Sequence, residues 1–260
     1  MILIQSRYFR KLIHSNRLNA NSIPVTTWIF VELIKDATLL RAVRAEAESA
    51  FEVDPASGMR RLDLLKLARL PLLQSIYFET LRMHVSVNLT REVAKDMPLD
   101  GYMLKKGYLV QAPSIIAHFD EEVWGAENHP ANEFWAERHI IYVDEVDESG
   151  NTKKVKKFSV ASKGGNLMAY GKQSYLVSFN YSKADYITGG GVSICPGRHF
   201  AKQEIMAAIA ILVANLDIEF EEWVQMDGAK SDRAPLDNQS YCGVVAMPPD
   251  RDARVRWRAR

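Results

Sequence analysis

A glycine-rich bend followed by an apolar, helix-periodic segment constrains this chain most strongly. Residues 189–198 read GGGVSICPGR, and residues 198–216 carry apolar side chains at helical spacing. The glycines allow positive φ values and let the backbone pass close to a flat, bulky group. Cys195 stands just before the predicted helix, whose N-terminus stabilises negative charge on the sulfur.

A thiolate in this position suits the axial ligand of a heme iron, because a thiolate donates electron density to the metal and favours O–O cleavage. The alternative is an inert structural cysteine beside a turn, which is the commoner role for an isolated cysteine. The choice between the two depends on the rest of the chain.

Residues 70–84 predict a helix with Pro71 in its first turn. Glu79 and Arg82 are three residues apart and therefore lie on one face of this helix. Such a pair contributes only about 0.2 to 0.5 kcal/mol on an exposed surface, so alone it indicates little. Farther along, residues 134–139 read FWAERH.

The order and spacing of these three segments resemble the cytochrome P450 superfamily from Asn19 to Trp257. The resemblance implies a mainly α fold with small β-sheets, matching the C-terminal portion of the P450 fold. It begins at the family's central helix, so about the N-terminal half of an ordinary member has no counterpart. We therefore expect a truncated gene product, an incorrect start codon or a fragment.

The resemblance assigns roles residue by residue. Glu79 and Arg82 match the family's E-x-x-R pair, and Arg138 matches the meander arginine that completes a buried, structural network. Arg91 matches a partner of a heme propionate, although a strand-surface arginine is nearly as good an interpretation. The remaining assignments are Cys195 as the axial iron ligand and Gly191, Ser193 and Gly197 as heme contacts.

Two residues of the bend depart from the family pattern. Thr188 stands where a phenylalanine normally packs near the thiolate, and Ser193 replaces the usual basic residue. A serine hydroxyl can donate one hydrogen bond, worth about 0.5 to 1.5 kcal/mol net, but it cannot form an ion pair with a propionate. Weaker heme retention is the expected consequence.

The distal side of the pocket is expected near Asn21, Ser22 and Pro24, where most family members carry an acid followed by threonine. A proline inside a helix removes a hydrogen bond and forces a kink, costing about 3 kcal/mol or more. We expect that kink beside the iron, with Asn21 and Ser22 offering polar groups to the pocket; a helix boundary is the alternative. The pattern is similar to that of the cholesterol 7-alpha-hydroxylase and prostacyclin synthase branch.

That branch leaves two mechanisms open. The first is a monooxygenase that uses heme b, O2 and NADPH electrons delivered by an NADPH-cytochrome reductase to oxidise an apolar sterol-, terpenoid- or other secondary-metabolite-like molecule. The second is a reductase-independent isomerase or dehydratase acting on a peroxide. A third possibility, from a different class, is a catalytically inactive remnant.

We treat residues 1–260 as a single partial heme-thiolate domain. Its parts are the central distal helix (10–34), the E-x-x-R helix (70–84), the meander (130–142), a polar insertion (144–174) and the Cys loop with its proximal helix (188–216). Short strands are expected over 90–94, 101–104 and 108–111. The charged 144–174 segment shows no clear period and predicts a surface loop. Asp36 is expected to cap a second helix.

The composition of the chain bears on its partners and on its location in the cell. The net charge is +1, which gives no indication of a nucleic-acid partner. Two cysteines, Cys195 and Cys242, are too few for a disulfide scaffold and fit a reducing compartment. The apolar run at residues 1–4 is too short for a membrane anchor. We expect a cytoplasmic chain as encoded, and an endoplasmic-reticulum location for a full-length eukaryotic relative.

Overall fold

The computed structural model describes residues 20–146, 150–160, 167–169, 195–243 and 246–260. Its helices are α2 (Ser22–Lys35), α3 (Ala37–Glu48), α4 (Leu64–Leu67), α5 (Pro71–His84), α6 (Ser114–His118), α7 (Glu121–Trp124), α8 (Arg198–Asn215) and the 3-10 turn η3 (Gln239–Tyr241). Its strands are β1 (Phe51–Val53), β2 (Arg60–Leu62), β3 (Asn88–Glu92), β4 (Met97–Leu99), β5 (Tyr102–Leu104), β6 (Leu109–Pro113), β7 (Ile140–Val146), β8 (Thr152–Phe158), β9 (Leu216–Val224) and β10 (Asp252–Ala259).

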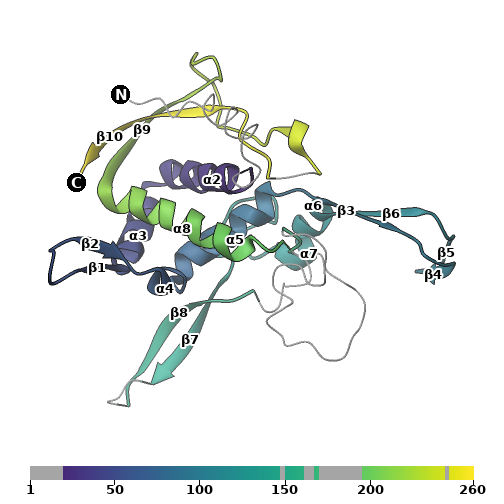
Figure 1. The fold of residues 1–260 in the computed structure, drawn as a ribbon, viewed down its shortest axis with the longest axis horizontal. Helices are drawn as coiled ribbons and strands as arrows, with labels where there is room; N and C mark the ends of the chain where they lie inside the picture. Colours follow the sequence, from purple (N-terminus) through teal and green to yellow (C-terminus); the bar gives the residue numbers. More distant parts are fainter. Residues whose placement is uncertain (1–19, 147–149, 161–166, 170–194, 244–245) are drawn as a thin grey trace.

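Helices α2, α3, α5 and α8 form the centre of the molecule, and the strand pairs extend from it (Figure 1). One apolar core joins the four helices, and its fully buried members include Ile29, Val43, Leu73, Ile76 and Ile209. The prediction of a mainly helical fold with small sheets agrees with this arrangement.

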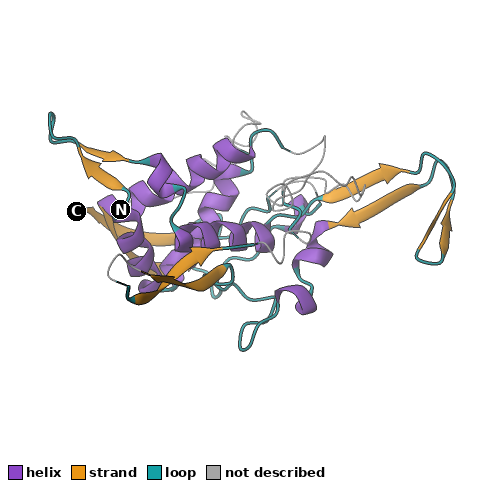
Figure 2. Cartoon of the chain, turned by 90° about the horizontal axis from the view of Figure 1, so that it is seen from below, coloured by secondary structure: helices purple, strands orange, loops and turns teal. Residues whose placement is uncertain are grey.

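The described strands pair as five two-stranded antiparallel sheets: β1–β2, β3–β6, β4–β5, β7–β8 and β9–β10. In Figure 2 the β3–β6 and β4–β5 pairs form an arm that projects away from the helices. The predicted strands are found within one to two residues of their expected positions. The β4 strand was not expected, and it pairs with β5 through a turn at Asp100 and Gly101, where both φ values are positive.

Helix ends follow the local chemistry that the sequence predicts. The Asp36 carboxylate accepts hydrogen bonds from the backbone N–H groups of Thr38 (2.8 Å) and Leu39 (3.0 Å), which confirms the expected cap. Pro71 is the first residue of α5, where its missing N–H removes no helical bond.

The expected proline kink is wrong for the described helix. Because α2 begins at Ser22, Pro24 lies in the first turn, where backbone N–H groups have no partner within the helix. The alternative interpretation, a helix boundary, fits this geometry. Residues 10–19 of the predicted segment lie outside the described residues.

The prediction of a loop over residues 144–174 is wrong in its first part. Residues 140–146 and 152–158 pair as the antiparallel hairpin β7–β8. Opposite charges face each other across the hairpin, with Asp144 opposite Lys154 and Glu145 opposite Lys153. Such cross-strand pairs stabilise the hairpin. In the sequence, the many charged residues of this segment resemble those of a solvated loop.

Candidate functional site

A buried ion network holds α5 against the segment that precedes β7. The Glu79 carboxylate accepts hydrogen bonds from Nε (2.9 Å) and Nη2 (2.8 Å) of Arg82. It also accepts one from Nε of Arg138, at 2.8 Å. All three side chains are fully buried, so the structure brings together the three residues that the resemblance groups.

The environment of Glu79 favours its ionised form. Burial opposes ionisation, but hydrogen bonds from Arg82 and His139 and the charges of both arginines hold the pKa of Glu79 well below its usual range. The two guanidinium groups are balanced by one carboxylate and by backbone carbonyls. Arg82 donates to the carbonyls of His118 and Ala131, each at 2.6 Å.

Arg138 binds the same segment, residues 118–138, at its C-terminal end. Its Nη2 donates to the carbonyl oxygens of Pro130 (3.0 Å) and Glu133 (2.8 Å), and its Nη1 donates to that of Trp124. The network therefore anchors residues 118–138 on α5. Its contacts are consistent with a structural function.

Cys195 lies beside the N-terminus of α8. Its thiol is exposed, and Gly197 is the N-cap of the helix. A Cβ atom at Gly197 would lie 3.8 Å from the Cys195 sulfur, at ordinary van der Waals distance. The positive end of the α8 helix dipole is directed toward this region. Thr188, Gly191 and Ser193 lie outside the described residues.

The residues expected on the distal side lie at the start of α2. The side-chain Oδ1 of Asn21 accepts a hydrogen bond from the backbone N–H of Ala246, at 2.9 Å. Ser22 is buried, and its carbonyl oxygen accepts the hydroxyl of Thr26 at 2.8 Å. One of the two groups expected to face the pocket thus holds the C-terminal segment in place through its side-chain oxygen.

Comparisons with known proteins identify the family. The family profile described as cytochrome P450 matches residues 20–139. The chain is 46% identical over 240 residues to cytochrome P450 monooxygenase calL of Penicillium decumbens, covering 92% of this chain and 40% of that protein. This chain belongs to the cytochrome P450 family.

Two mammalian P450s are also similar to it. Cytochrome P450 7A1 of Rattus norvegicus is 27% identical over 250 residues, covering 93% of this chain and 43% of that protein. The 7-alpha-hydroxycholest-4-en-3-one 12-alpha-hydroxylase of Homo sapiens is 27% identical over 249 residues, covering 92% and 42% respectively. These matches confirm the expected likeness to the 7-alpha-hydroxylase branch. The chain spans about two fifths of the length of these P450 relatives.

The P450 family implies a heme cofactor, and the donor set around Cys195 fits one. Among the residues that the structure describes, no three His, Cys, Asp or Glu side chains gather into a metal-binding group. An exposed thiol beside a helix N-terminus is a residue that would hold the iron of such a cofactor.

Arg91 lies on β3 with an exposed side chain, and its Nη1 donates to the carbonyl of Thr90 at 2.6 Å. Within the described ranges the structure shows no contact between Arg91 and Cys195. Its assignment to a propionate stays a prediction.

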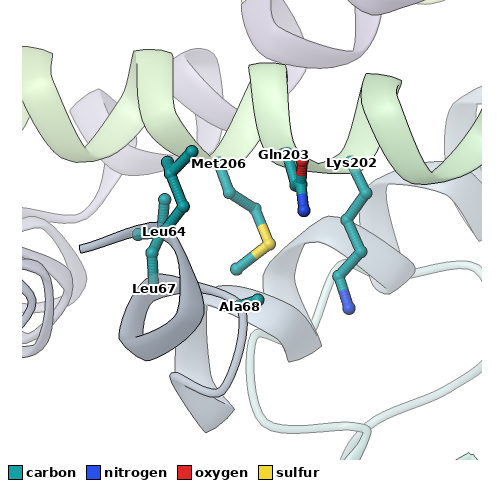
Figure 3. A pocket seen from close by; sticks show the side chains of 6 residues that line it. All are labelled: Leu64, Leu67, Ala68, Lys202, Gln203 and Met206. Carbon is teal, nitrogen blue, oxygen red and sulfur yellow. The ribbon is translucent and has the colours of Figure 1, made fainter. Parts of the chain in front are cut away.

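A small hollow between α4 and α8 was not anticipated from the sequence. Figure 3 shows its lining residues, Leu64, Leu67, Ala68, Lys202, Gln203 and Met206. Its volume of about 10 Å³ admits no more than one water molecule, so it cannot hold a substrate. Burial lowers the pKa of the Lys202 amine to about 8, and the amine donates to Oε1 of Gln74 on α5 at 2.7 Å.

The sequence also gave no signal for the contacts that join α2, α5 and the C-terminal segment. Trp28 stacks on His84 with ring centroids 3.9 Å apart, and its Nε1 donates to the Met247 carbonyl at 2.7 Å. His84 Nδ1 lies 2.8 Å from Oδ1 of Asp237. These partners are more than 150 residues apart or come from different helices, so no local pattern links them.

Within the described part of the chain, no helix combines the length and the hydropathy that a bilayer-spanning segment needs.

Proposed function

We propose that this chain is the heme-thiolate portion of a monooxygenase that inserts one oxygen atom from O2 into an apolar small molecule. The observation that carries the proposal is the exposed Cys195 thiol beside the N-terminus of α8, in a chain of the P450 family. When bound, the heme supplies the redox chemistry of oxygen activation.

In this proposal Cys195 holds the iron through its deprotonated sulfur. The N-terminus of α8 stabilises the negative charge, and Gly197 keeps the backbone turn free of a side chain next to the sulfur. The network of Glu79, Arg82 and Arg138 joins α5 to residues 118–138, so we assign it a structural role.

On the distal side that the resemblance implies, the start of α2 would supply polar groups to the pocket. The Asn21 oxygen is occupied by the Ala246 N–H, so its amide NH2 is the part of this side chain that can donate to a ligand or water in the pocket. Pro24 has no N–H, so the first turn of α2 offers one donor fewer at that point. We assign Asn21 and Ser22 to holding water or substrate there.

Names of relatives support the choice of reaction and substrate class. Two of the three relatives compared above are named a monooxygenase and a hydroxylase, and the name of the second specifies 7-alpha-hydroxycholest-4-en-3-one. We therefore propose a sterol-, terpenoid- or other secondary-metabolite-like substrate and an NADPH-cytochrome reductase as the electron-donating partner.

The test is turnover with isotopically labelled O2, NADPH and a reductase on a panel of sterols and terpenoids. The proposal predicts products that carry one labelled oxygen atom, and no product from a Cys195→Ala variant. Product formed from a hydroperoxide without NADPH or reductase would instead establish the isomerase or dehydratase. Failure to retain heme would identify an inactive remnant.

A further inference from the structure

The side chain of Lys202 joins three elements of the fold. Lys202 lies in the second turn of α8, and its amine donates to Oε1 of Gln74 on α5 at 2.7 Å. The same amine lies 5.3 Å from the centre of the Phe78 ring on α5 and 5.7 Å from that of Phe158 on β8. At both distances a cation is attracted to an aromatic face. The charged amine therefore holds the N-terminal part of α8 against α5 and the β7–β8 hairpin, an arrangement that Figure 1 shows for the two helices.

No carboxylate in the described part of the chain pairs with this amine, whose printed hydrogen-bond acceptor is an amide oxygen. Glu79 on α5 is bound to two arginines, and Glu46 on α3 accepts two backbone N–H groups of α5. Glu204 is two residues farther along α8 and therefore lies on a different face of that helix. Ionisable groups on the elements around Lys202 include Glu46 of α3, Lys66 of α4, Tyr77, Glu79 and Arg82 of α5, His139 and Lys156 at the hairpin, and Arg198, His199 and Glu204 of α8.

The contacts of Lys202 with the two rings last only while its amine is protonated. Burial lowers the pKa of this amine to about 8, because a charged amine loses hydration when it leaves water. A neutral amine is no longer attracted to the ring faces. Raising the pH therefore removes two of the three contacts that join Lys202 to α5 and β8.

Cys195 is attached to the same end of α8. Its carbonyl oxygen accepts hydrogen bonds from the backbone N–H (3.4 Å) and from Nη1 (3.1 Å) of Arg198, the first residue of the helix. Lys202 lies one turn beyond Arg198. A shift of the first two turns of α8 therefore moves the backbone of Cys195 with them.

We propose that Lys202 is a positioning residue for Cys195: its ammonium group fixes the first two turns of α8 against α5 and β8, and loss of its proton to water releases them. The effect on an iron-bound sulfur rests on the proposed heme-thiolate function. The response of α8 itself does not require heme.

The test measures hydrogen–deuterium exchange of the backbone N–H groups of residues 201–205 on both sides of pH 8, corrected for the intrinsic effect of pH on exchange. Residues 210–214 of the same helix are the internal control. Lys202→Met removes the charge at every pH, whereas Lys202→Arg keeps a cation that does not lose its proton. Gln74→Glu gives the amine a carboxylate partner, which favours the charged form.

We expect the protection of residues 201–205 in the unmodified chain to fall by roughly five- to thirtyfold as the pH rises through this region, with residues 210–214 unchanged. Lys202→Met should show the low protection throughout, and Lys202→Arg the high protection throughout. Gln74→Glu should move the transition to higher pH. The transition should persist in a Cys195→Ala background, so that ionisation of the thiol cannot account for it.

Protection that does not change with pH in the unmodified chain would overturn the inference, and so would an equal change in Lys202→Arg. A transition that disappears in the Cys195→Ala background would also overturn it, because the thiol would then set the response. The measurements are made on the whole chain with and without added heme. Absence of a thiolate spectrum in the heme-loaded chain, with the transition of α8 intact, would overturn the proposed function and leave the response of α8 standing.

Discussion

Glu79 is the residue on which two buried cations depend. Its carboxylate accepts hydrogen bonds from both Arg82 and Arg138, at distances of 2.8 to 2.9 Å. Replacing it by glutamine keeps the shape but removes the charge, and thus leaves two guanidinium groups buried without a counter-ion. We expect Glu79→Gln to lower the free energy of unfolding by about 3 to 5 kcal/mol, measured by urea denaturation.

The matched control is Glu137→Gln, in the same segment as Arg138. Glu137 pairs with Lys156 at 2.5 Å, but both side chains are partly exposed. An exposed pair of this kind contributes about 1 kcal/mol or less. Equal losses of stability in the two variants would contradict the structural importance assigned to the Glu79 network.

His118 predicts a pH dependence of stability. First burial and then the charge of Arg82 lower its pKa to about 4, from an ordinary value of 6.5. Between these values the unfolded chain binds the proton and the folded chain does not, so stability falls as the pH falls through this window. We expect a loss of about 2 kcal/mol from this group between pH 7.5 and pH 5.

The measurement is the free energy of unfolding at the two pH values, for the unmodified chain and for His118→Gln. Glutamine does not titrate and can still accept the Met168 N–H that now bonds to the histidine Nε2 at 2.9 Å. The difference in stability between the two proteins should therefore shrink at pH 5. A difference that stays constant with pH would show that His118 is protonated in the folded chain.

At the scale of elements, the start of α2 differs from the kinked helix interior that we expected on the distal side. Pro24 lies in the first turn of this helix, where it costs little. We expect Pro24→Ala to change the free energy of unfolding by less than about 1 kcal/mol. A gain of about 3 kcal/mol or more would mean that Pro24 interrupts a helix, as the sequence suggested.

Elements were predictable where one strong local signal sets them. Asp36 caps α3 and Pro71 begins α5 as their chemistry requires. The β7–β8 hairpin was missed because its strands carry Asp144, Glu145, Lys153 and Lys154, which resemble a solvated loop until their cross-strand pairing is seen. The position of Pro24 was misjudged because a proline near a helix start and one inside a helix give the same local sequence.

At the scale of the whole molecule, the sequence predicted the residues of the candidate site but not the long-range contacts between them and the rest of the fold. The motif around Cys195 and the spacing of Glu79 and Arg82 were visible because they are local. The bond from Ala246 to Asn21 spans 225 residues, so only the folded chain reveals it.

The central claim is that Cys195 binds heme iron through its thiolate. The most direct test is the absorption spectrum of the reduced, heme-loaded chain with carbon monoxide, compared with that of Cys195→Ala. We predict a strongly red-shifted Soret band that disappears in the variant. A chain that binds heme but shows the same unshifted band with and without Cys195 would contradict the claim.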